Sequence, residues 1–243
     1  MTGDARRTAV IVGASSGIGE ALACELNATG WRLGLLARRI ERLEALRNQF
    51  GPETLIRALD VTRSDAEAIL ERAIEDLGGA DLVIISSGTG HNTALDPELD
   101  LDAVRVNVSG FMAVAQVAMR HFLNRRRGHL VGITSVAALR GNRAATYAAS
   151  KAFQSVYLDG LRDVARHSGD PITVTEVQPG FVDTAMMKPD RPLPALTRRL
   201  LVSSPAKAAK QILRAIQKRR KHAYITRRYA LVAFVLRRLP RPG

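Results

Sequence analysis

Short apolar runs alternate with amphipathic stretches along most of the chain. Seven runs of five or six residues predict buried β-strands, at Thr8–Val12, Arg32–Ala37, Thr54–Leu59, Asp81–Ile85, His129–Thr134, Ile172–Val177 and His222–Thr226. Helical patterns predict the elements between them, at residues 20–29, 40–49, 64–78, 102–124, 147–166 and from Ser204 onward. Because continuous apolar strands alternate with helices, we predict an α/β fold: a single doubly wound parallel sheet with helices on both faces.

Glycine, proline and polar residues follow directly after several of these strands. In a parallel sheet covered by helices, ligands bind at the carboxyl ends of the strands. We therefore expect one binding site at that edge of the sheet, formed by residues that include Gly13, Asp60, Gly88, Ser135 and Pro179.

The composition predicts a globular protein of the cytoplasm. The 243 residues are 46% hydrophobic, which is enough to bury a sizeable core. Cys24 is the only cysteine, so no intramolecular disulfide can form, in agreement with a reducing compartment. The residues before Thr8 do not resemble a signal peptide, and no apolar run is long enough to predict a membrane-spanning helix.

The histidines do not show the spacing of metal ligands. For this reason we predict no metal site. All five are interpreted as surface or loop residues: His91, His121, His129, His167 and His222.

Positive charge is concentrated near the C-terminus. The net charge is +13, but residues 1–190 hold 21 Lys and Arg against 23 Asp and Glu, whereas residues 191–243 hold 15 Lys and Arg and no acid. Basic residues also flank the apolar stretch Tyr229–Leu236, which predicts a basic amphipathic extension over residues 227–243. Two interpretations are open: a helix packed on its own domain or on a second subunit, or a peripheral contact with a membrane. No recognition motif accompanies the charge, so we predict no nucleic-acid binding.

A glycine-rich turn follows the first predicted strand. Its glycines are spaced G-x-x-x-G-x-G between an apolar run and a helical pattern. Glycine permits the tight turn and lets main-chain N–H groups approach a pyrophosphate at the helix N-terminus. We therefore predict a dinucleotide cofactor held by Gly13, Ser15, Ser16, Gly17, Ile18 and Gly19.

The end of the second predicted strand favours NADP(H) over NAD(H). NAD-selective folds place an acid there to bind the ribose hydroxyls, and this chain has Arg38 and Arg39 instead. A guanidinium binds phosphate through two hydrogen bonds, whereas an acid would repel the 2′-phosphate. We predict Arg38 as the main ligand of that phosphate and Arg39 as its helper.

One predicted helix carries a phenol and an ammonium on the same face, because Tyr147 and Lys151 lie four residues apart. Ser135 precedes Tyr147 by twelve residues, and Asn107 precedes it by forty. Together with the glycine turn, these side chains predict an oxidoreductase that moves a hydride between a dinucleotide and a carbonyl or alcohol.

These motifs together resemble the short-chain dehydrogenase/reductase family over about residues 6–226. The resemblance implies a Rossmann-like fold, a Ser-Tyr-Lys catalytic type, and a homodimer or homotetramer formed through the helices at about 102–124 and 147–166. It implies a catalytic set of Asn107, Ser135, Tyr147 and Lys151. It also extends the cofactor site to Asp60, Val61, Gly88, Tyr147, Lys151, Pro179, Gly180, Val182 and Thr184.

The chain departs from the family pattern in two places. Residues 85–88 read Ile-Ser-Ser-Gly, where Asn-Asn-Ala-Gly is usual, so the roles of Ser86 and Ser87 stay open. The spacing from Ser135 to Tyr147 is one residue shorter than the commonest family spacing, which implies a trimmed loop at residues 140–143 beside the substrate.

Each catalytic residue has an expected role. Tyr147 acts as acid/base, Ser135 holds the substrate oxygen, and Lys151 lowers the pKa of Tyr147 and binds the nicotinamide ribose. Lowering a tyrosine pKa by three units takes about 4 kcal/mol, which an ammonium at about 4 Å supplies at an effective dielectric near 20. In the family, the residue at the position of Asn107 supports a water that links the lysine to solvent.

The segment at about 181–203 is expected to line the substrate site. Its apolar residues predict an apolar carbonyl or alcohol as substrate: Met186, Met187, Leu193, Leu196 and Leu200. We predict a catalytic domain over residues 1–226, which includes this segment, and an extension over residues 227–243. An alternative hypothesis is an NADP-binding sensor or scaffold that acts at a membrane surface through its basic tail.

Overall fold

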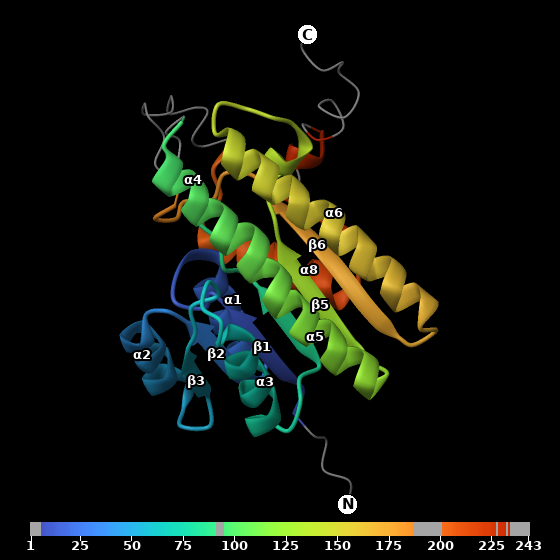
Figure 1. The fold of residues 1–243 in the computed structure, drawn as a ribbon. Coiled ribbons are helices and arrows are strands. Elements are labelled where there is room, and N and C mark those ends of the chain that lie inside the picture. The colour runs from blue at the N-terminus through green and yellow to red at the C-terminus, as the bar shows by residue number, and fades with distance from the viewer. Residues whose placement is uncertain (1–5, 91–94, 187–200, 227, 232, 234–243) are drawn as a thin grey trace, which may run out of the picture.

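The computed structural model describes residues 6–90, 95–186, 201–226, 228–231 and 233 (Figure 1). Seven parallel strands form one sheet in the order β3-β2-β1-β4-β5-β6-β7. The predicted strands are confirmed, with ends that differ by at most two residues: β1 Thr8–Val12, β2 Arg32–Ala37, β3 Leu55–Ala58, β4 Leu82–Ile85, β5 Gly128–Ile133, β6 Ile172–Pro179 and β7 His222–Ile225.

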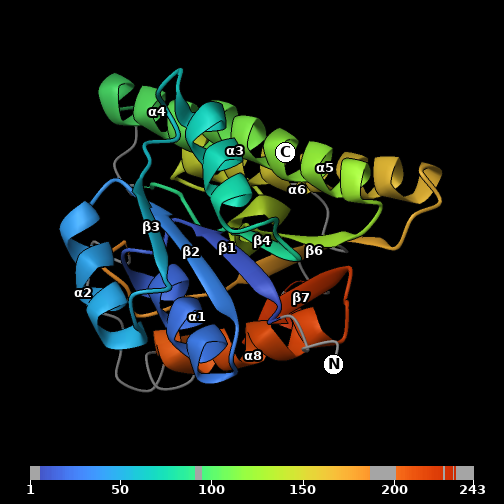
Figure 2. The same cartoon turned by 90° about the horizontal axis from the view of Figure 1, so that it is seen from below.

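Helices cover both faces of this sheet (Figures 1 and 2). One face carries α1 (Gly17–Ala28), α2 (Ile40–Phe50) and α8 (Pro205–Gln217), and the other carries α3 (Ala66–Asp76), α5 (Phe111–Arg125) and α6 (Ala145–His167). The predicted doubly wound α/β fold is therefore confirmed.

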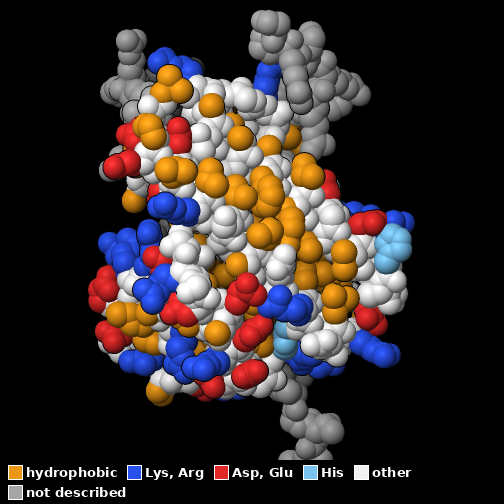
Figure 3. Space-filling view, in the orientation of Figure 1, with side chains coloured by type: hydrophobic (Ala, Val, Ile, Leu, Met, Phe, Trp, Pro, Cys, Tyr) orange, Lys and Arg blue, Asp and Glu red, His pale blue; other side chains and the backbone are white. Residues whose placement is uncertain are grey.

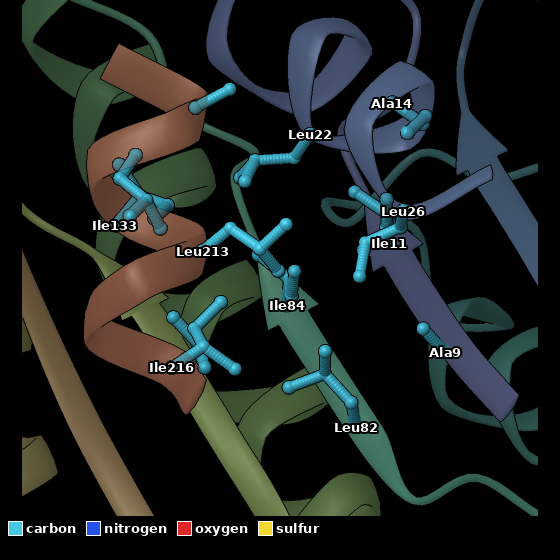
Figure 4. Packing of buried hydrophobic residues seen from close by; sticks show 14 of the residues in the cluster. Ala9, Ile11, Ala14, Leu22, Leu26, Leu82, Ile84, Ile133, Leu213 and Ile216 are labelled. Atoms are coloured by element: carbon cyan, nitrogen blue, oxygen red, sulfur yellow. The ribbon is translucent and has the colours of Figure 1, made fainter. Parts of the chain in front are cut away.

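Alternation along the strands divides the core between the two faces. Ala9 and Ile11 of β1 belong to the cluster that packs against α1 and α8, whereas Val10 and Val12 belong to the cluster that packs against α3, α5 and α6. Figure 4 shows the first cluster, in which α8 lies over β4 and β5 and packs against α1. The cluster includes Leu22 and Leu26 of α1, Leu82 and Ile84 of β4, Ile133 of β5, and Leu213 and Ile216 of α8. The two layers cover both faces of the sheet beneath its carboxyl edge.

The predicted helix at 102–124 is three consecutive elements in the structure. It consists of α4 (Pro97–Val104), a π-helical turn (Arg105–Gly110) and α5. The start of α4 is capped by Asp96, whose carboxylate accepts a hydrogen bond from the Leu99 N–H at 3.1 Å. A π-helical turn adds a residue to a helical turn and is common at functional sites. This one contains Asn107.

The C-terminal segment begins by packing on its own domain. Tyr229 and Ala233 are buried, and the Tyr229 ring meets Phe181 edge-on with ring centroids 6.4 Å apart. A Cβ on Gly180 would lie 1.9 Å from the Tyr229 ring, so the ring lies directly against that main chain. These contacts favour the packing interpretation for the start of the extension. Residues 227, 232 and 234–243 lie outside the described residues.

The surface interpretation of the histidines is wrong for His129. This side chain is buried in β5, where Nε2 lies 2.8 Å from Thr175 Oγ1, and burial lowers its pKa to about 4. His121 is half-buried against the main chain of Ala80. His91 lies outside the described residues. Across the described ranges, no set of three His, Cys, Asp or Glu side chains is grouped so that it could hold a metal.

None of the helices in the described part of the chain has both the length and the apolar character needed to cross a bilayer.

Candidate active site

The glycine turn after β1 requires glycine for steric reasons. Gly13 and Gly17 have φ values of +88° and +61°, in the left-handed region that other residues rarely adopt. A Cβ on Gly19 would lie 2.1 Å from the Gly13 carbonyl oxygen, and a Cβ on Gly13 would lie 2.5 Å from the Ser87 nitrogen. The turn therefore packs against itself and against the loop after β4. Since β1 and β4 are neighbours at the point where the strand order reverses, this is where such sheets bind ligands.

The N-terminus of α1 is not capped by the side chain that occupies its cap position. Ser16 holds that position with extended backbone, and its hydroxyl makes no capping hydrogen bond. Instead, Ser16 Oγ accepts a hydrogen bond from Arg39 Nη2 at 2.7 Å, and Ser15 Oγ accepts from the same nitrogen at 3.0 Å. A helix N-terminus carries a partial positive charge, and a guanidinium now lies beside it. This combination suits a phosphate.

The two arginines after β2 are placed differently. Arg39 contacts the glycine turn, whereas Arg38 is exposed and makes no hydrogen bond or ion pair with any described residue. Arg39 makes no ion pair with a carboxylate in the described ranges either, so its charge is not neutralised there. The ranking of the two arginines from sequence, Arg38 before Arg39, does not match their contacts.

The remaining predicted cofactor residues are divided between contact with the turn and structural support. Thr184 lies over the turn, because a Cβ on Gly17 would be 3.1 Å from its Cγ2. Asp60 Oδ1 accepts hydrogen bonds from Thr62 N at 3.0 Å and Thr62 Oγ1 at 2.8 Å, which shapes the loop after β3. The others are held by packing and main-chain contacts: Ile18 packs on the core, Val61 is buried against Gly110, Pro179 ends β6, and Val182 bridges to Ser203.

Ser135 and Tyr147 come together from β5 and α6. Ser135 follows β5, and its Oγ accepts a hydrogen bond from Ala137 N at 3.1 Å while also hydrogen-bonding Tyr147. The Tyr147 ring lies against the loop after β4, since a Cβ on Gly90 would be 2.6 Å from ring carbon Cδ2. Burial raises the pKa of Tyr147, and the hydrogen bond with Ser135 lowers it by a smaller amount, so the net effect is a raised pKa.

Lys151 is buried on the same helix, and its ammonium hydrogen-bonds Gln154 and the end of β5. Nζ donates to Gln154 Oε1 at 2.9 Å and to the Ile133 carbonyl oxygen at 3.4 Å, and it lies 5.8 Å from the centroid of the Tyr147 ring. Burial lowers the pKa of Lys151 to about 8. In this structure the contribution that lowers the pKa of Tyr147 comes from Ser135, and burial outweighs it. The lowering of the Tyr147 pKa by Lys151 stays a prediction.

Asn107 ties the loop after β4 to α6. Its Oδ1 accepts from Thr89 N at 3.0 Å, and its Nδ2 donates to Thr89 O at 2.7 Å and to Ser150 Oγ at 3.0 Å. Ser150 Oγ in turn donates to the Tyr147 carbonyl oxygen at 2.8 Å. A Cβ on Gly88 would lie 3.3 Å from both Asn107 Oδ1 and Lys151 Nζ, so that glycine keeps the two groups close to the main chain.

A buried carboxylate supports the strand end before Ser135. Glu176 of β6 is fully buried and accepts hydrogen bonds from Thr134 Oγ1 at 2.9 Å, Gln178 Nε2 at 2.8 Å and His222 Nδ1 at 2.9 Å. Burial raises the pKa of Glu176, but these hydrogen bonds outweigh it and hold the pKa below its ordinary value. The network links β6 to β7 and to Thr134, the residue that precedes Ser135.

The structure brings the predicted catalytic residues into one cluster and adds members that the sequence analysis missed. Thr89, Gly90, Ser150 and Gln154 contact Asn107, Tyr147 or Lys151. Gln154 had a detectable signal, because it is a polar residue at the helical spacing of three from Lys151. The contacts of Thr89 and Gly90 depend on the path of a loop, which no local pattern reveals.

The predicted substrate segment is described only in part. Phe181 and Met186 are exposed, as an apolar lining of an open site would be. Met187, Leu193, Leu196 and Leu200 lie outside the described residues.

Comparison with known proteins identifies the family. A model of the short chain dehydrogenase family matches residues 7–194. An uncharacterized oxidoreductase of Myxococcus xanthus is 38% identical over 199 residues, covering 78% of each chain. A short-chain dehydrogenase from Streptomyces avermitilis has the same fold, with a TM-score of 0.80 at 23% identity over 96% of this chain and 92% of that one. A variant of actinorhodin polyketide ketoreductase, solved with NADPH, has a TM-score of 0.78 at 25% identity, covering 93% of this chain and 97% of the other. The chain belongs to the short-chain dehydrogenase family of oxidoreductases.

Proposed function

We propose that this oxidoreductase reduces an apolar carbonyl compound to an alcohol with NADPH. The observation that carries the proposal is the convergence of Ser135, Tyr147 and Lys151 beside the glycine turn, at the carboxyl edge of the sheet. The polyketide ketoreductase that shares the fold was solved with NADPH, which supports the same cofactor here.

The reaction needs a hydride on the carbonyl carbon and a proton on the carbonyl oxygen. Bound NADPH would supply the hydride. Ser135 would donate a hydrogen bond to the substrate oxygen as negative charge develops there. Tyr147 would deliver the proton, and its raised pKa favours that direction because the phenol keeps its proton throughout the neutral range. The reverse reaction requires a tyrosinate, which this environment disfavours.

The other predicted residues have supporting roles in this proposal. The glycine turn and the N-terminus of α1 would hold the pyrophosphate, with Asp60 and Val61 on the adenine side and Pro179, Gly180, Val182 and Thr184 towards the nicotinamide. Lys151 would bind the nicotinamide ribose. Asn107 holds the loop after β4 against α6 through its side chain, and its main-chain oxygen accepts a hydrogen bond from Gln154 Nε2 at 2.9 Å.

The reaction is tested by measuring NADPH consumption against a graded series of carbonyl compounds, from small and polar ketones to long-chain and polycyclic ones. We expect turnover to be concentrated on the large apolar members, because Phe181 and Met186 of the expected substrate segment expose apolar surface. Tight NADPH binding without turnover on any member would contradict the proposal.

The contacts of Arg39 support this residue, in place of Arg38, as the main ligand of the 2′-phosphate. We expect Arg39→Ala to reduce the preference for NADPH over NADH by about 10- to 100-fold, because a charge-assisted hydrogen bond contributes roughly 1.5–3 kcal/mol. Arg38→Ala is the matched control and should change the preference less. The measurement is kcat/KM with each cofactor for both variants. A larger loss in Arg38→Ala would restore the ranking made from sequence.

Self-association through the long helices stays a prediction, and the surface supports it. Figure 3 shows a band of hydrophobic side chains across the face formed by α5 and α6. Met112, Val156 and Val164 are exposed on these helices. Covering them with a second copy would bury apolar area that otherwise faces water.

The alternative hypothesis of a sensor or scaffold at a membrane receives no support from the comparisons, since the matching family and the M. xanthus relative are oxidoreductases. Burial of Tyr229 and Ala233 also accounts for the start of the basic extension without a membrane. A location in the cytoplasm stays a prediction.

A further inference from the structure

Gln154 is a fully buried amide whose two ends are both engaged next to Lys151. It lies on α6 three residues after Lys151, and its side chain is 0% exposed. Its Oε1 accepts a hydrogen bond from Lys151 Nζ at 2.9 Å, and its Nε2 donates to the Asn107 main-chain oxygen at 2.9 Å. One amide therefore joins the buried ammonium to the π-helical turn.

An amide is costly at this position unless its hydrogen bonds are needed. Leu158, one turn further along the same buried face of α6, is an apolar core residue. Burying an unpaired amide is unfavourable, whereas an aliphatic side chain would add to the core. Both polar ends of Gln154 are paired, so the amide replaces core packing with a specific link between Lys151 and Asn107.

Among the described residues, no carboxylate forms an ion pair with the Lys151 ammonium. The Ile133 carbonyl oxygen of β5 is a longer acceptor at 3.4 Å, and Gly88 contributes only main chain. On α6 the neighbouring titratable group is Tyr147, whose ring centroid is 5.8 Å from Nζ. No carboxylate among the described residues affects the pKa of Lys151, which burial alone lowers to about 8. The acceptor at 2.9 Å is therefore the closest stabiliser of the charged form.

We propose that Gln154 is the positioning residue of the catalytic lysine: its oxygen holds the Lys151 ammonium, and its nitrogen anchors that oxygen to the main chain at Asn107. The expected effect of Gln154 on carbonyl reduction rests on the proposed function. The family resemblance puts a water between this lysine and solvent, and here an amide takes the direct link to Asn107. Because an amide does not ionise near neutral pH, the link keeps the proton on Lys151 and does not pass it on.

The test follows the charge of Lys151 in the ligand-free protein. NMR of the protein with 13C-labelled lysine reports the titration, and Lys151→Met identifies the signal. Gln154→Met keeps a similar volume but removes the acceptor, so we expect the midpoint, near pH 8 in the unchanged protein, to fall by about one to two pH units. Gln154→Glu keeps an acceptor, and its midpoint should lie at or above that of the unchanged protein.

The same variants test the effect on the reaction. The alkaline limb of kcat/KM for carbonyl reduction should move to lower pH in Gln154→Met, with about a tenfold loss near pH 8, and should return in Gln154→Glu. If Gln154→Met folds and the titration midpoint of Lys151 does not move, the proposal is overturned. If Gln154→Met does not fold, a lowered midpoint of Lys151 in Gln154→Glu overturns it. A midpoint that moves as expected while the enzyme reduces no carbonyl supports the positioning role and contradicts the proposed function instead.

Discussion

Replacing Tyr147 with phenylalanine is expected to abolish carbonyl reduction while leaving NADPH binding nearly unchanged. The substitution removes the proton donor and its hydrogen bond with Ser135, and it keeps the ring that packs on Gly90. General acid catalysis contributes roughly 10²- to 10⁴-fold to a rate. We expect kcat/KM to fall by about 10³-fold, because a phenylalanine ring has no proton to donate to the carbonyl oxygen.

A second tyrosine on the same helix provides the control. Tyr157 stacks on Phe153 with centroids 5.5 Å apart and lies away from Ser135, so Tyr157→Phe removes a hydroxyl without touching the site. Steady-state kinetics should show full carbonyl reduction by Tyr157→Phe and none by Tyr147→Phe. Fluorescence titration should show that both variants bind NADPH. Turnover of Tyr147→Phe within a few-fold of the unchanged protein would remove Tyr147 from its assigned role.

Replacing Gly19 with alanine is expected to eliminate measurable NADPH binding. The added Cβ would lie 2.1 Å from the Gly13 carbonyl oxygen and 3.3 Å from Ala14 Cα, so the turn has to open to admit it. An opened turn no longer presents its main-chain N–H groups to the pyrophosphate at the start of α1. We expect the Kd for NADPH to rise at least about 100-fold, equivalent to about 2.7 kcal/mol.

Gly160 separates this steric effect from the general effect of adding a methyl group. It is an exposed glycine of α6, and a Cβ there would meet nothing within 4 Å. Gly160→Ala should leave NADPH affinity unchanged and raise stability by about 0.5–1 kcal/mol, because alanine favours the helix. Thermal unfolding of both variants shows whether Gly19→Ala still folds. If folded Gly19→Ala binds NADPH within a few-fold of the unchanged protein, the turn is not the pyrophosphate site.

The raised pKa of Tyr147 and the lowered pKa of Lys151 have one physical cause. Both groups are buried, and burial disfavours whichever form carries a charge: tyrosinate for the one, ammonium for the other. A neutral phenol at neutral pH is a proton donor, which matches reduction. Lys151 stays charged up to about pH 8, so the ammonium is the first of the two groups to titrate as the pH rises.

The strands, the glycine turn and the order of the catalytic residues could be predicted from sequence because each depends on short-range pattern. A buried strand such as β1 needs a continuous apolar run, and Gly13, Gly17 and Gly19 are needed because the backbone turns sharply there. The spacing of Tyr147 and Lys151 places them on one helix face wherever that helix lies. These inferences do not require knowledge of which elements are neighbours.

Tertiary structure alone decided what each of these groups contacts. The sequence ranked Arg38 above Arg39, yet only Arg39 reaches the serines of the glycine turn. The ammonium of Lys151 hydrogen-bonds Gln154 and lies 5.8 Å from the centroid of the Tyr147 ring. Hydrogen bonds and desolvation act over a few ångströms between residues that are far apart in the chain. A one-dimensional pattern therefore reveals which residues are chemically able to act, and the packing of α6 on β5 and the π-helical turn determines their charge and partners.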